Sequence, residues 1–141
     1  MKKALIVIIS IFFLGSCSLE DDGESIMQNL APVQSVELPE SFEPGQTYNI
    51  GIIYRRPTSC HAYSGLDVAR NGNEIIIGVV TSYSSASSNC VETGNLEARA
   101  TINFVAERED FYIFKFWQGK NQAGNDIFLT VEVPVTRPGS D

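Results

Sequence analysis

The chain has 141 residues, of which 17 are acidic and 10 basic, so its formal net charge at pH 7 is −7. This excess of acid argues against nucleic-acid binding, because proteins of that class carry clustered lysine and arginine. Hydrophobic residues make up 43% of the chain and charged residues 19%. That is enough apolar material for one folded domain, and it excludes a chain that is disordered throughout.

The N-terminus has the pattern of a signal peptide. Lys2 and Lys3 give it a positive start, and residues 4–14 are apolar or small except for Ser10. These eleven residues would span about 16 Å as a helix, well short of the roughly 30 Å hydrocarbon core of a membrane. We therefore expect the core of a signal peptide here and not a transmembrane helix.

The apolar segment ends in the sequence Leu14-Gly15-Ser16-Cys17. This run of an aliphatic residue, two small residues and a cysteine resembles the lipobox of bacterial lipoproteins. The resemblance implies that residues 1–16 are a lipoprotein signal peptide and that Cys17 takes up lipid. Several fatty chains on one cysteine would anchor the protein firmly to a membrane. The alternative is a plain signal peptide followed by an ordinary cysteine.

Residues 17–34 show no hydrophobic periodicity and begin with a run rich in acid, glycine and serine. This composition predicts a flexible tether behind the lipidated cysteine. The acidic residues Glu20, Asp21 and Asp22 resemble the surface-export signal of lipoproteins in Bacteroidetes-type bacteria. The resemblance implies a lipid-anchored protein of the outer membrane that is exposed on the cell surface. The alternative is a protein of the same membrane that faces the periplasm.

From residue 35 to residue 136 the dominant pattern is the alternation of apolar and polar residues that is typical of β-strands. Turn-forming residues separate the apolar runs, as in Asn71-Gly72-Asn73. The predicted strands cover residues 35–38, 47–54, 62–70, 74–83, 97–104, 111–117 and 127–135. Residues 137–141 are expected to form a C-terminal tail.

Seven short strands within residues 35–136 resemble the pattern of immunoglobulin-like or fibronectin-type domains. The resemblance implies an all-β fold, a seven-stranded antiparallel immunoglobulin-like β-sandwich that follows the signal peptide and the tether. In the last strand but one, the alternation directs Phe114 and Phe116 to the core and Trp117 outward. The cysteine pair and the strand tryptophan of antibody domains are missing, so the resemblance concerns fold and carries no function.

Two cysteines, Cys60 and Cys90, remain once Cys17 is assigned to lipid. They form an even pair in an oxidising compartment, and alternating strand directions place both at the same end of the sandwich. We therefore predict a disulfide. The alternative, a pair of reactive or metal-binding thiols, has only His61 as a neighbouring ligand, which is not the spacing of a zinc site. The sequence predicts no metal, no cofactor and no catalytic residues.

The connections after the second, fourth and sixth predicted strands are expected to gather at one end of the sandwich. Four residues in or next to the first and the last of these connections are candidates for binding: Arg55, Arg56, His61 and Trp117. Loops on a rigid scaffold often carry recognition, and tryptophan and arginine are enriched at interfaces. The alternative is structural. Trp117 would then cover the edge of the sandwich, and the arginines would pair with carboxylates.

Together these features predict a lipid-anchored envelope protein with a non-enzymatic binding or accessory role, whose partners are the membrane, through Cys17, and a protein or glycan. The alternative is a protease inhibitor. Some bacterial inhibitors are immunoglobulin-like and insert the same three connections into a protease cleft.

Overall fold

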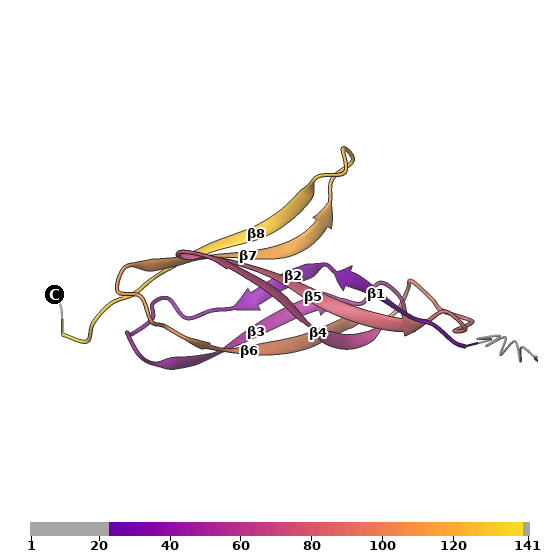
Figure 1. The fold of residues 1–141 in the computed structure, drawn as a ribbon, viewed down its shortest axis with the longest axis horizontal. Coiled ribbons are helices and arrows are strands. Elements are labelled where there is room, and N and C mark those ends of the chain that lie inside the picture. Colours follow the sequence, from indigo (N-terminus) through magenta and orange to yellow (C-terminus); the bar gives the residue numbers. More distant parts are fainter. Residues whose placement is uncertain (1–22, 140–141) are drawn as a thin grey trace, which may run out of the picture.

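A computed structural model describes residues 23–139, which fold into eight β-strands in two sheets with no helix. The strands are β1 (Ile26–Ala31), β2 (Val33–Glu37), β3 (Thr47–Arg55), β4 (Ala62–Asn71), β5 (Glu74–Ser84), β6 (Glu97–Val105), β7 (Phe111–Lys120) and β8 (Asp126–Pro134). Figure 1 shows the two sheets stacked with their strands along the long axis of the molecule. Between residues 23 and 139 there is accordingly no helix with the length and apolar character needed to cross a membrane.

The larger sheet is organised around β5, which is paired along both edges. One edge pairs with β4 in an antiparallel hairpin from Asn71↔Glu74 to Ala62↔Ser82. The other edge has two partners in succession, because β7 pairs with residues 74–77 and β1 pairs with residues 79–84. β8 then adds to the free edge of β7 and makes this sheet five-stranded.

The smaller sheet has the order β2-β3-β6, with both neighbours antiparallel to β3. The chain passes from the larger sheet to the smaller one at Pro32, which separates β1 from β2. Ala31 and Val33, on either side of this proline, are both buried. The start of the domain therefore ties the two sheets together.

The core lies between the sheets, and the predicted alternation describes it well. Tyr112, Phe114 and Phe116 of β7 are buried, as are alternate residues of other strands in both sheets. The other buried members from strands are Ala31, Val33, Ile50, Ile52, Tyr54, Ile75, Ile77, Val79, Ala100, Phe104 and Val133. The alternation in β8 directs Ile127 to the same side as Val133, but Ile127 is 42% exposed, at the end of the hairpin where the β7–β8 register shifts.

Phe42 lies at the centre of the aromatic core, although it belongs to no strand. Its side chain is fully buried, and its ring lies 4.7 Å from Tyr48, 5.2 Å from Phe104 and 5.9 Å from Tyr112, measured between ring centroids. A parallel bridge to Val135 holds its backbone in place. The loop before β3 thus supplies the aromatic side chain that closes one end of the sandwich.

The structure corrects the predicted boundary between tether and domain. Residues 26–34 were assigned to the tether, but they form β1 and the first residues of β2, so the strand count is eight and not seven. Only the last residue of β1, Ala31, is buried. The strand is held by its backbone ladder with β5, so its side chains carry no hydrophobic period that would predict it.

The pairing of β5 with β7 is parallel, which corrects the prediction of a wholly antiparallel sandwich. The cause is the hairpin at residues 71–74, where Gly72 has a φ of 63°. This hairpin folds β4 to the outer edge of the sheet and leaves β5 beside β7. The immunoglobulin-like arrangement expected from the sequence would instead place the strand before this hairpin, here β4, beside β7.

We predict that the substitution Phe42→Ala lowers the free energy of unfolding by about 3–5 kcal/mol, because it empties a fully enclosed aromatic site. Chemical denaturation followed by circular dichroism measures this loss. Val105→Ala is the control, since Val105 is 42% exposed and its truncation should cost less than about 1 kcal/mol. Equal losses in the two variants would contradict the central packing role of Phe42.

Candidate binding site on the outer face of the larger sheet

Trp117 lies on the outer face of the larger sheet, at the point where the β7–β8 hairpin bends. The ladder between the two strands shifts between Trp117 and Gly119, and Gly119 has a φ of 115° that suits glycine. Figure 1 shows the hairpin curving away from the other strands beyond this point. The bend opens a concave surface between the hairpin and β1, β4 and β5.

This surface contains a hollow of about 290 Å³ that is lined by residues of all five strands of the sheet. Its apolar members come from all five strands of the sheet, and its polar members come from β4, β7 and β8. The lining residues are Leu30, Asp67, Ala69, Ile76, Gly78, Trp117, Lys120, Asp126 and Phe128. Gly78 lies on the floor, where an added Cβ would come within 3.0 Å of Leu30 Cδ2.

The indole of Trp117 is held in one orientation by Asp126. Trp117 Nε1 donates a hydrogen bond of 2.9 Å to Asp126 Oδ1, and Lys120 Nζ donates one of 2.8 Å to the same oxygen. The lysine and then the indole N–H lower the pKa of Asp126 below its ordinary value, so this carboxylate is charged at neutral pH. Because its N–H is engaged, the indole presents its apolar ring to the hollow.

A second hollow, of about 650 Å³, continues from the first around Trp117. Leu30, Trp117 and Lys120 line both of them. The second hollow is further lined by Gln28, Asn29, Pro32, Arg55, Arg56 and Pro57. The two hollows therefore form one groove, which we call the Trp117 groove, across the outer face of the sheet and past β1.

Arg55 and Arg56 border the Trp117 groove, but their guanidinium groups are used elsewhere. Arg55 donates to the carbonyl of Glu92 at 2.8 Å, and Arg56 donates to the carbonyls of Ser59, His61 and Asn95 at 3.3–3.5 Å. Within residues 23–139 neither arginine has a carboxylate partner. Their charge holds the long β5–β6 loop against the β3–β4 loop, a role that the sequence did not predict.

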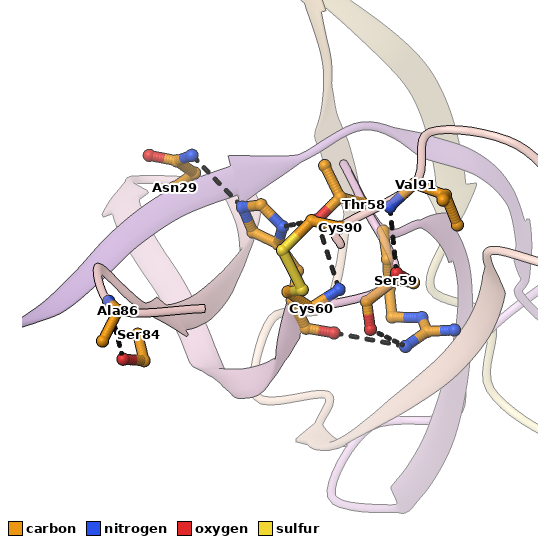
Figure 2. Close-up of a disulfide and its surroundings, with 10 residues drawn as sticks. Asn29, Thr58, Ser59, Cys60, Ser84, Ala86, Cys90 and Val91 are labelled. Carbon is orange, nitrogen blue, oxygen red and sulfur yellow. Dashed lines mark hydrogen bonds between the residues drawn. A yellow bond between two sulfur atoms is a disulfide. The ribbon is translucent and has the colours of Figure 1, made fainter. Parts of the chain in front are cut away.

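The predicted disulfide between Cys60 and Cys90 is confirmed, with their Cα atoms 5.4 Å apart. Figure 2 shows it joining the β3–β4 loop to the β5–β6 loop. Beside it, Ser59 N donates to the carbonyl of Val91, and Val91 N donates to Ser59 Oγ. These bonds and the arginines give the two loops one rigid shape.

His61 is a buried structural residue with 5% of its surface exposed. Its Nδ1 lies 2.8 Å from Thr58 Oγ1, its Nε2 lies 3.3 Å from Asn29 Nδ2, and its ring packs 4.5 Å from that of Tyr83. The amide of Asn29 is a donor, so Nε2 accepts and Nδ1 carries the proton. The ring thereby connects β1 to the disulfide-linked loops. Burial, and next the charge of Arg56, lower the pKa of His61.

The three connections expected to gather at one end are only partly gathered. The β3–β4 and β5–β6 loops are cross-linked, whereas the β7–β8 turn stands apart from them at the tip of the bent hairpin (Figure 1). The turn closes on itself, with Asn121 N donating to Asn125 O. The bend at Trp117 and Gly119 accounts for this separation.

Of the four candidate binding residues, Arg55, Arg56 and Trp117 border one groove and His61 does not. The sequence missed Leu30 and Asp67 as groove residues. Leu30 was placed in the tether, and nothing local distinguishes Asp67 from other exposed acids.

Residues 23–139 contain no cluster of three or more histidine, cysteine, aspartate or glutamate side chains that could hold a metal ion. The proposed lipid site Cys17, the signal peptide 1–16 and the acidic residues 20–22 lie outside the residues that the structure describes. No protein-family profile, curated protein or solved structure matches the chain.

We predict that replacing both Cys60 and Cys90 by serine lowers the free energy of unfolding by about 3–4 kcal/mol, because the disulfide closes a loop over a separation of 30 residues. Equilibrium denaturation in guanidinium chloride measures the change. The matched control is Cys17→Ser, which removes a cysteine outside the disulfide and should leave the unfolding midpoint unchanged. A double variant as stable as this control would contradict the prediction.

We predict that the protein loses stability as the pH falls below 6.5, the ordinary histidine pKa. The unfolded chain then binds a proton at His61 that the folded chain resists, so the loss grows until the pH reaches the lowered pKa of the folded state. Unfolding midpoints measured from pH 8 to pH 5 test this. The variant His61→Gln should show a flatter profile in the same range. Parallel profiles for the two proteins would exclude His61 as the cause.

Proposed function

We propose that this protein is a lipid-anchored binding protein of the bacterial outer membrane, held by lipid on Cys17. Its role is non-enzymatic, and it engages its partner at the Trp117 groove. The observation that carries the proposal is the half-buried tryptophan, held by Asp126 on a concave sheet face. Such a site, apolar with a few placed polar groups, is the usual form of a binding pocket.

The positions of the chemically reactive residues support a binding role over a catalytic one. Cys60 and Cys90 are joined to each other, which removes both thiols as nucleophiles. His61 is buried with both ring nitrogens engaged. A general base needs an open path to its substrate, and this histidine has structural neighbours instead.

We also propose that the domain is a variant of the immunoglobulin-like sandwich. The sheet β2-β3-β6 facing β5-β7-β8 supports this relation, while the parallel pair β5–β7 sets the variant apart. Two of the loops that a protease inhibitor of this type would use are held together by the disulfide, and the third stands apart. The groove is therefore the better-supported binding surface.

The anchoring half of the proposal is tested by metabolic labelling with a fatty-acid analogue in a bacterial host. The wild-type chain should carry the label and sediment with outer membranes, and Cys17→Ala should lose both properties because it lacks the acceptor thiol. Ser18→Ala, a change at the adjacent residue, is the control and should keep the label. Label retained on Cys17→Ala would refute the lipid anchor.

The binding half is tested by recovering partners from envelope extract with the immobilised domain. Trp117→Ala should lose the partners that the wild type retains, since tryptophan dominates the binding energy where it is central to a site. Tyr63→Ala is the matched control, because Tyr63 is an aromatic residue that is 50% exposed and lies outside both hollows. Identical partners for both variants would exclude the groove.

A further inference from the structure

We infer that the Trp117 groove binds a neutral polysaccharide, with a sugar ring stacked on the indole and its hydroxyl groups bound by the surrounding acceptors. This inference rests on the proposed function and specifies its ligand.

The aromatic wall of the groove is held in an orientation that suits a flat ligand. The indole N–H of Trp117 is bonded to Asp126 at 2.9 Å, so the ring cannot turn to offer its edge without losing that bond. Phe128 lies opposite Trp117 in the β7–β8 ladder and lines the same hollow. A pyranose ring has one face rich in C–H groups, which packs on such a surface.

Several acceptors around this wall have no donor, whereas the basic side chains that line the groove are already bonded to Asp126 or to loop carbonyls. Within residues 23–139 the carboxylate of Asp67 has no hydrogen bond or ion pair, and Asp126 uses only Oδ1. The amides of Gln28 and Asn29 donate to Ser64 and His61, which leaves their oxygens for a ligand. A ligand that supplies several hydroxyl donors beside an apolar face matches this set.

Other classes of ligand fit the groove less well. A lipid chain would cover the carboxylate of Asp67, which has no donor within residues 23–139, and would supply none. An anionic ligand would meet the carboxylate of Asp67, and the three basic side chains that line the groove are already bonded to Asp126 or to loop carbonyls. A peptide that adds to a sheet needs a free strand edge, and the floor residues Ile76 and Gly78 belong to β5, which is paired along both edges.

The dimensions of the groove leave room for more than one sugar unit. The first hollow has about 290 Å³ and the second about 650 Å³, with Trp117 shared between them. Pockets for small ligands occupy about 300–1,000 Å³. One sugar ring in the first hollow would leave the second hollow open to the units that follow it past β1.

The test is native gel electrophoresis of the lipid-free mature chain through gels that contain one polysaccharide each. Mannan, lichenan, amylopectin and galactomannan are the neutral probes, and polygalacturonate is the acidic probe. We expect at least one neutral probe to retard the protein. We also expect the bound probe to shift the tryptophan emission of the protein to shorter wavelength. Trp117 is the only tryptophan in the chain, and its ring loses water on binding.

Three variants of groove residues and one control test whether the retardation depends on the Trp117 groove. Trp117→Ala should weaken retardation by about tenfold or more, and Asp67→Asn should weaken it to a lesser degree. Ala69→Gln keeps the tryptophan and its hydrogen bond but fills the first hollow from the exposed face of β4, so it too should reduce binding. Tyr63→Ala, outside the groove, should bind as the wild type does. Thermal unfolding of each variant confirms that it is folded.

Several outcomes would overturn the inference: no retardation by any neutral probe, retardation by polygalacturonate alone, or undiminished retardation of both Trp117→Ala and Ala69→Gln. These results are separate from a failure of the proposed function. If a protein partner is still recovered from envelope extract through Trp117, the groove remains a binding site and only its ligand class is wrong.

Discussion

The structure depends on the complete pairing of β5. This strand is apolar on both faces, and its inner face forms the middle of the core through Ile75, Ile77 and Val79. Its backbone groups must be paired, because buried peptide groups without partners are costly. β4 satisfies one edge throughout, and the other edge is divided between β7 and β1. β1, β4 and β7 are thus placed by pairing with β5, and β8 is placed by pairing with β7.

The division of that edge also produces the groove. β7 follows β5 only as far as Ile77, opposite Phe116, and beyond it the hairpin bends away at Trp117 and Gly119. β1 fills the vacated edge of β5, and Asn29 connects β1 to His61 beside the disulfide-linked loops. The proposed binding surface thus lies where two strands share one partner. The loops near it are rigid because a disulfide and two arginines hold them.

The strands from β3 to β8 were predictable, and the reason is visible in their burial. In β7 the alternate residues Tyr112, Phe114 and Phe116 face the core, so the apolar residues recur at every second position because one face of the strand is buried. β1 has no such alternation of apolar residues, since five of its six residues are exposed. Phe42 also escaped prediction, because a single buried aromatic residue in a loop carries no period at all.

The candidate site was likewise predictable only in part. The sequence by itself determined that Trp117 faces outward, that Cys60 and Cys90 lie at one end, and that the body is all-β, because these follow from strand alternation and strand direction. Only the tertiary structure decided that Leu30, Asp67 and Trp117 share a groove, and that Arg55 and Arg56 bind loop carbonyls. Those arrangements depend on which strand edges pair and where one hairpin bends, and contacts between residues so far apart in the chain leave no local pattern in it.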